Sequence, residues 1–150
     1  MTQLSNQPQA SNNPVLIEEL LTTRGATWAV VGLTDSPHRV AKPVASFVKN
    51  ELGMRIVPVN PRRETVNGDR AYRRITEVPH TIDVLHVFVN AEAAEAIVDD
   101  AIRLGVKNIW FQLDVDSPAA IEKALAAGVN VVADTCHSIE GRTRTIAWRM

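Results

Sequence analysis

Five short apolar runs recur along the chain, at residues 27–32, 55–61, 83–90, 108–113 and 129–134. Their central positions are mostly aliphatic or aromatic and carry almost no charge. Continuous runs of this length are typical of strands that are buried on both faces, as in a parallel sheet. The pattern therefore predicts five buried strands.

Between these runs, apolar residues return every three or four positions, which is the period of a helix with one buried face. The predicted helices occupy residues 40–52, 91–104 and 117–127, and each precedes a glycine that is typical of a helix C-terminus, namely Gly53, Gly105 and Gly128. One more helix is predicted before the first strand, with Asn13 as its N-cap and Pro14 at its first position.

Strands and helices that alternate with short connections predict an α/β fold, with a parallel sheet covered on both faces. Right-handed crossovers then give a Rossmann-like, doubly wound sheet of about five strands in three layers, α/β/α. Pro58 in the second run indicates a less central or irregular strand. Asn67-Gly68 predicts a turn in the polar stretch 62–80.

The length of 150 residues is typical of one domain, and we expect a single domain over residues 14–150. Residues 1–13 are rich in asparagine, glutamine and serine, and we expect them to form a disordered tail. This N-terminus lacks the basic start and apolar core of a signal peptide. No apolar run approaches the roughly 18 residues that span a bilayer, so we expect a cytoplasmic protein without membrane contact.

Charge and cysteine content exclude further classes of function. Sixteen Lys and Arg residues against seventeen Asp and Glu give a net charge of -1, which argues against a dedicated nucleic-acid binder. The single cysteine, Cys136, forms neither an internal disulfide nor a four-thiolate zinc site. A local basic cluster for one small anionic ligand remains compatible with this balance.

Ligands of open parallel sheets bind beyond the carboxyl ends of the strands, so the loops after the strands are the candidate site. In the first of these loops, Gly32 permits a close backbone approach, while Thr34 and Ser36 offer hydroxyl groups. The helix that follows offers free N–H groups to an anion. The loop lacks the further glycines of G-x-G-x-x-G and the Gly-Lys pair of a P-loop, so a plain strand-to-helix turn remains an equal alternative.

A basic pair, Arg62-Arg63, stands after the second strand, where a fold that prefers NAD places an acidic residue. Two arginines at this position suit a phosphate on the ribose. Together with Arg39 and Lys42 they would place positive charge around one crevice. The alternative is a solvated turn.

The sequence predicts no catalytic residue and no metal ligand. Cys136 and His137 are neighbours in sequence, but a reactive cysteine needs a base beside it in space. The other histidines lack metal-ligand spacing, and His86 within a strand is expected in the core. Trp28 and Trp110 are expected in the sheet or core as well.

The strand ends, taken together, resemble a known family. The matching segments, in chain order, are Val30-Val31-Gly32-Leu33-Thr34 with Ser36, Pro37 and Arg39, then Val57-Pro58-Val59-Asn60-Pro61, Gly68 with Ala71-Tyr72, Val84 to Phe88, Trp110-Phe111-Gln112-Leu113 and Asp134-Thr135-Cys136. They resemble the small stand-alone CoA-binding proteins, which are similar in fold to the CoA-binding domain of the succinyl-CoA synthetase alpha subunit. The resemblance covers roughly residues 25–140.

This resemblance implies that coenzyme A or an acyl-CoA binds at the carboxyl edge of the sheet. By position, the phosphates or the pantetheine arm would be approached by Gly32, Thr34 and Ser36. The region of the adenosine 3′-phosphate would be met by Asn60, Pro61, Arg62 and Arg63. Gln112 would lie near the pantetheine end, with Cys136 behind it. Arg39 and Lys42 complete the predicted binding residues.

The histidine that is phosphorylated in the synthetase lies in another of its domains, and nothing in this chain matches that domain. The resemblance therefore implies a binding module without catalysis, acting as a sensor, carrier or regulator. One alternative is an NADP-binding redox module, which the arginines favour and the missing glycines oppose. Another is an interaction domain with a vestigial nucleotide pocket. No protein partner is indicated.

Overall fold

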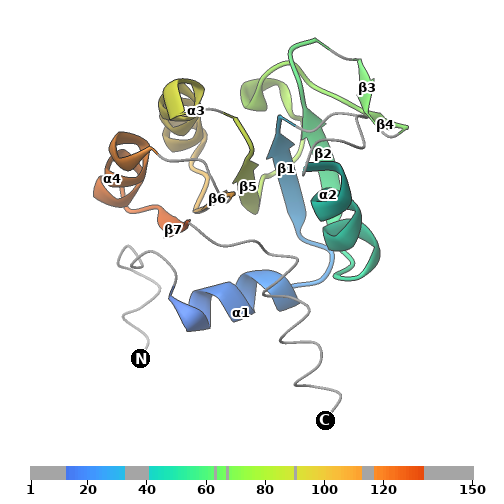
Figure 1. The fold of residues 1–150 in the computed structure, drawn as a ribbon, viewed down its shortest axis with the longest axis horizontal. Helices are drawn as coiled ribbons and strands as arrows, with labels where there is room; N and C mark the ends of the chain where they lie inside the picture. The colour runs from blue at the N-terminus through green and yellow to red at the C-terminus, as the bar shows by residue number, and fades with distance from the viewer. Residues whose placement is uncertain are drawn as a thin grey trace.

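The central feature of the computed structural model is a five-stranded parallel sheet (Figure 1). The structure describes residues 13–32, 41–62, 64–66, 68–89, 91–112 and 117–133. The strands are β1 (Thr27–Val31), β2 (Arg55–Val59), β5 (Val84–Val87), β6 (Asn108–Phe111) and β7 (Asn130–Val132), in the spatial order β2-β1-β5-β6-β7. All five correspond to predicted strands, which confirms the predicted Rossmann-like α/β fold.

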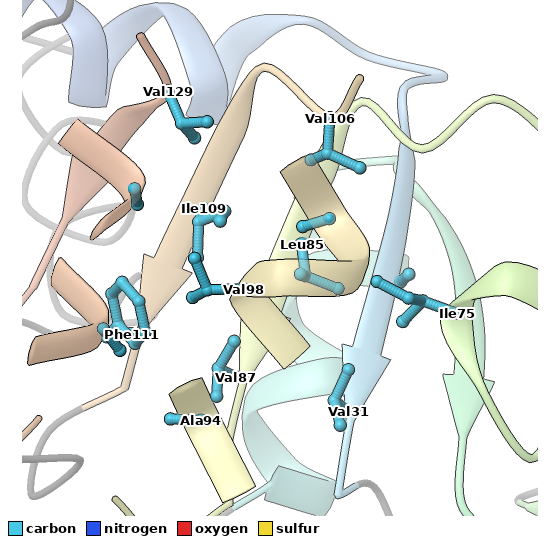
Figure 2. Packing of buried hydrophobic residues seen from close by; sticks show 14 of the residues in the cluster. Val31, Ile75, Leu85, Val87, Ala94, Val98, Val106, Ile109, Phe111 and Val129 are labelled. Atoms are coloured by element: carbon cyan, nitrogen blue, oxygen red, sulfur yellow. The ribbon is translucent and has the colours of Figure 1, made fainter. Parts of the chain in front are cut away.

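Helices cover both faces of this sheet. They are α1 (Pro14–Thr22), α2 (Ala41–Asn50), α3 (Ala91–Leu104) and α4 (Pro118–Ala126), with a short 3-10 helix, η2 (Ile75–Glu77). Apolar residues of α1 and α2 share one buried cluster with one face of the sheet, and those of α3, α4 and η2 share another cluster with the opposite face. Figure 2 shows Ala94 and Val98 of α3 among Val87, Ile109 and Phe111 of the sheet. The three predicted layers are confirmed.

Capping residues set the ends of several helices. The Asn13 side chain accepts the N–H groups of Val15 and Leu16 at 2.9 and 3.3 Å, as an N-cap does. Helix α2 ends at Asn50, two residues before the predicted end. The Phe47 carbonyl accepts the N–H groups of both residues 51 and 52, and this tight turn leads into Gly53 at a φ of +74°.

The second strand lies at an edge of the sheet, as its proline indicated. The carbonyl of Pro58 accepts the N–H of Tyr72 at 3.0 Å, and the Tyr72 carbonyl accepts the N–H of Asn60 at 2.8 Å. Proline fits here because the outer edge of β2 needs no further N–H donor at this position. Tyr72 thus runs beside the end of β2 as a single bridged residue.

The stretch 62–80 contains more structure than its polar composition indicated. A small antiparallel hairpin of β3 (Thr65–Val66) and β4 (Asp69–Arg70) surrounds the predicted turn, where Gly68 has a φ of +84°. Val66, Ala71 and Ile75 from this stretch are buried in the two apolar clusters. The turn was predicted correctly, whereas the strands, of two residues each, leave no readable period in the sequence.

Under the α1 and α2 face lies a group of aromatic rings, formed by Trp28, His86, Phe88 and Trp110. The His86 ring centroid lies 4.2 Å from that of Phe88, 5.9 Å from that of Trp28 and 6.2 Å from that of Trp110. His86, Trp28 and Trp110 are fully buried, which confirms all three as core residues. Burial lowers the pKa of His86 from its ordinary value of 6.5 to about 3, against the opposing effect of a hydrogen bond with Gln112.

Gly32 follows β1 directly, at the point where that strand pairs with the end of β5. Its φ of +96° favours glycine, and its N–H donates to the Val59 carbonyl at 3.0 Å. A Cβ at this position would lie 3.3 Å from both the Cβ of Phe88 and the Cγ1 of Val89. Both the backbone angle and the close approach therefore require glycine.

The substitution Gly32→Ala is expected to lower the free energy of unfolding by about 1–3 kcal/mol, because it adds backbone strain and a tight contact. Urea unfolding measures this change. The matched control is Gly128→Ala, at a φ of +85° with no heavy atom within 4 Å of the added Cβ. It carries the backbone strain alone, so an equal loss in both variants would contradict the close approach at Gly32.

Stability is expected to fall on mild acidification because of His86. The unfolded chain takes up a proton near pH 6.5 and the folded chain only near pH 3, so the unfolded state binds more protons between these values. The contribution is therefore complete above pH 6.5 and decreases as the pH falls, by about 2 kcal/mol between pH 7.5 and 5. Urea unfolding across this range should show the decrease in the wild type and in His80→Gln, an exposed-site control. The same decrease in His86→Phe would assign it to other groups.

Candidate functional site at the carboxyl edge of the sheet

The order of the strands marks one point of the sheet as the candidate site. From β1 the chain continues to β2 on one side, and then returns to β5 on the other side of β1. The crossovers therefore diverge between β1 and β5, and a crevice is expected beyond the carboxyl ends of these two strands. Gly32 follows β1 at this point, and Phe88 and Val89 follow β5.

Hydrogen bonds between the strand ends hold this edge together. The N–H of Phe88 donates to the Val31 carbonyl at 2.9 Å, and the N–H of Gln112 donates to the Val87 carbonyl at 3.1 Å. Gln112 is the first residue after β6, one strand further along the sheet. The structure thus brings Gly32, Phe88 and Gln112 to neighbouring strand ends, although they are far apart in sequence.

The loop after β2 is shaped by Asn60. Its side-chain oxygen accepts the N–H of Arg62 at 2.8 Å, which closes a turn over Pro61. Asn60 itself is buried, whereas Pro61 and Arg62 are exposed. Asn60 therefore orients the backbone of this loop, on which the Arg62 residue is exposed to solvent.

Gln112 and His86 form a buried polar pair. The Nε2 atom of His86 lies 3.0 Å from Oε1 of Gln112, and the Gln112 residue is only 4% exposed. Because an amide oxygen can only accept, His86 carries a proton on Nε2 and donates it to Gln112. The lowered pKa of His86 favours the neutral ring, in which this is the only ring N–H.

Several predicted binding residues lie outside the described part of the chain, namely Thr34, Ser36, Arg39, Arg63 and Cys136. Lys42 lies in the first turn of α2, where the structure describes the backbone. The described members of the predicted set are Gly32, Asn60, Pro61, Arg62 and Gln112. All five lie directly after β1, β2 or β6, at the carboxyl edge.

Two residues near this edge were not predicted from the sequence as binding residues. Tyr72 is half-buried beside Asn60, and the Arg70 guanidinium lies 5.2 Å from the centroid of its ring. This is within the range of a cation–π interaction. The signal available in the sequence is the group of five arginines between residues 62 and 74, of which the strand-end pattern predicts a binding role only for the first two.

Some of the other described arginines and lysines form ion pairs that connect other elements of the fold. Arg74 pairs with Asp100 of α3 at 3.1 Å. Lys123 of α4 contacts Asp99 at 3.1 Å and Glu95 at 3.2 Å, both on α3, and these hydrogen bonds raise the pKa of Lys123, chiefly through Asp99. These pairs link helices on one face of the sheet.

Two hollows in the described residues lie at the opposite edge. One of about 340 Å³ is lined by Ile82, Leu104 and Val106 among others, and one of about 380 Å³ includes Glu19, Arg24, Asp83 and Asn108. Val106, Ile82 and Asp83 come just before their strands, so both hollows lie at the amino ends. Residues 33–40, 113–116 and 134–150, which come after β1, β6 and β7 in the sequence, are not described.

The described residues contain neither a metal-binding cluster nor a membrane-spanning helix. Across these parts of the chain, no group of three or more His, Cys, Asp or Glu side chains could hold a metal ion. Within the same parts, the helices are too short or too polar to cross a membrane.

The chain is similar in sequence and in structure to other small proteins. The uncharacterized protein YneT of Bacillus subtilis (strain 168) is 28% identical over 120 residues, which cover 80% of this chain and 87% of that protein. A hypothetical protein from Pyrococcus horikoshii OT3 has a solved structure with a TM-score of 0.81 and 32% identity, covering 92% of this chain and 95% of that one.

A longer relative matches only in part. The acetate–CoA ligase [ADP-forming] II subunit alpha of Pyrococcus furiosus is 28% identical over 81 residues, which are 54% of this chain and 18% of that subunit. The chain thus spans about a fifth of the ligase subunit. The family described as the CoA binding domain matches residues 26–142, which include all five strands and every predicted binding residue. This chain belongs to the CoA binding domain family.

Proposed function

We propose that this protein binds coenzyme A or an acyl-CoA at the carboxyl edge of its sheet, and that it does so without catalysing a reaction, as a sensor, carrier or regulator. The observation that carries the proposal is the position of Gly32, Arg62 and Gln112 directly after three strands of one sheet edge, within the matched family region. We also propose that residues 14–150 act as one domain, with residues 1–13 as a tail.

Each part of coenzyme A would meet groups of matching chemistry. The backbone at Gly32 allows close approach of the pyrophosphate or the pantetheine arm, and Thr34 and Ser36 would add hydroxyl groups. Arg62 and Arg63 would bind the 3′-phosphate through charge-assisted hydrogen bonds, with Arg39 and Lys42 adding positive charge. Gln112 would contact the pantetheine end, with Cys136 behind it.

Among the described residues, His86 is the histidine nearest to this edge, and its state bears on whether it could act as a general acid or base. A general acid or base works best when its pKa lies near the operating pH. The pKa of His86 is about 3, and its Nε2–H is occupied by Gln112. His86 is therefore poorly suited to proton transfer near neutral pH.

An NADP-binding redox module is the competing proposal, because Arg62 stands where an NAD-specific fold has an acidic residue. The two ligands share an adenosine and a pyrophosphate but differ in the second half of the molecule and in the position of the ribose phosphate. They can therefore be compared directly on one protein.

Coenzyme A is expected to raise the melting temperature more than NADP or NAD does. At a hundredfold excess over its dissociation constant, a ligand stabilises the folded state by about 2.7 kcal/mol, or roughly 5–10 °C for a chain of this size. Thermal melts with each ligand at equal concentration test this. A larger shift with NADP would favour the redox module, and no shift with any ligand would favour an interaction domain with a vestigial pocket.

The substitution Arg62→Ala is expected to weaken binding of coenzyme A by about ten- to a hundredfold and to leave dephospho-CoA nearly unaffected, because the lost partner is the 3′-phosphate. Isothermal titration calorimetry with both ligands measures the difference, and Arg63→Ala should behave alike. The control is Arg103→Ala, which removes an equal charge from the exposed end of α3. Equal weakening of both ligands by Arg62→Ala would place this arginine at the pyrophosphate instead.

A further inference from the structure

The His86 ring lies in surroundings that suit an apolar side chain. It is completely buried on β5, and its ring centroid lies 5.9 Å from that of Trp28, 6.2 Å from that of Trp110 and 4.2 Å from that of Phe88. A phenylalanine or leucine would fill such a position without a polar atom. Burying an imidazole here is unfavourable unless its polar atoms are hydrogen-bonded.

The hydrogen bond from Nε2 of His86 ends on Gln112, a residue of the carboxyl edge. His86 and Gln112 lie on adjacent strands, and the parallel register pairs His86 with Trp110, two positions before Gln112. Side chains two positions apart along a strand point to the same face. The histidine thus reaches from the aromatic core to the first residue beyond the end of β6.

This bond fixes the orientation of the Gln112 amide. Oε1 accepts the proton on Nε2 of His86, so the oxygen of the amide is directed toward the core. The two N–H groups lie on the other branch of the same planar group. Without a donor at His86, the amide could rotate by half a turn and exchange its oxygen and nitrogen.

We infer that His86 is a positioning residue, which holds Gln112 so that the amide N–H groups serve a hydrogen-bond acceptor of the ligand. In coenzyme A the matching acceptor is an amide carbonyl of the pantetheine arm. The inference rests on the proposed function for the identity of the ligand. The orientation of Gln112, in contrast, is a property of the protein alone.

The test compares coenzyme A with adenosine 3′,5′-bisphosphate, which lacks the pantetheine arm. His86→Phe keeps a ring of similar size and removes the donor, so the affinity for coenzyme A relative to the bisphosphate should fall about three- to tenfold. Isothermal titration calorimetry with both ligands gives this ratio. An unchanged ratio in a folded His86→Phe protein would overturn the inference.

Two further variants separate positioning from a general effect on the core. In His86→Gln the new amide can again donate to Oε1 of Gln112, and the affinity ratio should recover toward the wild-type value. Trp110→Phe disturbs the same aromatic group but leaves the His86–Gln112 bond in place, so the ratio should stay unchanged. A fall of the ratio in Trp110→Phe equal to that in His86→Phe would show that packing alone is responsible, and would contradict the inference.

A measurement without ligand distinguishes failure of this inference from failure of the proposed function. Nitrogen-15 NMR of the free protein should show His86 with its proton on Nε2, and the Gln112 side-chain amide signals should shift strongly in His86→Phe. If the wild type binds neither ligand, the proposed function is wrong, and these signals still decide whether His86 orients Gln112. Gln112 signals that are the same in both proteins would overturn the positioning role.

Discussion

A parallel sheet cannot be closed by hairpins, so every connection between its strands must cross one of its faces. In this chain the crossover from β1 to β2 runs through α2 on one face, whereas those that pass η2, α3 and α4 run on the other. Among the described helices, α2 would then be the only one on the first face, beside the hairpin residues Val66 and Ala71. Helix α1, which precedes all strands, completes that cover through Leu16, Ile17, Leu20 and Leu21. The buried aromatic group lies under this cover of α1 and α2. The crossovers diverge between β1 and β5 because they run on opposite faces of the sheet.

The same constraint explains which parts of the fold can be predicted from the sequence. Strands buried on both faces leave continuous apolar runs, and helices with one buried face leave a regular period, so these elements were predicted within a few residues. The hairpin and Tyr72 were missed, because a two-residue strand and a single bridged residue leave no period. Tyr72 is placed by backbone hydrogen bonds with Pro58 and Asn60, which form only once the whole fold has brought these segments together.

The candidate site could be predicted only as a set of loops. The rule for strand ends predicted Gly32, Asn60, Arg62 and Gln112, and the structure places all four after strands at the carboxyl edge. It could not show that Asn60 bonds to its own loop, nor that Gln112 bonds to a histidine 26 residues away. Such pairs depend on strand register and side-chain orientation. The binding roles of all the predicted residues stay predictions, and Thr34, Ser36, Arg39, Arg63 and Cys136 also lie outside the described residues.

The attachment of Tyr72 to the outer side of β2 limits association between copies of this protein through that edge strand. An edge strand with unpaired backbone groups is a template for another chain, and association through such edges leads to aggregates. Here Pro58 offers no N–H, and its carbonyl and the N–H of Asn60 are already occupied by the backbone of Tyr72. Tyr72, which follows the hairpin, therefore covers the end of β2 and opposes the addition of a strand from another chain there. The loop after β2 stays accessible to solvent at Pro61 and Arg62.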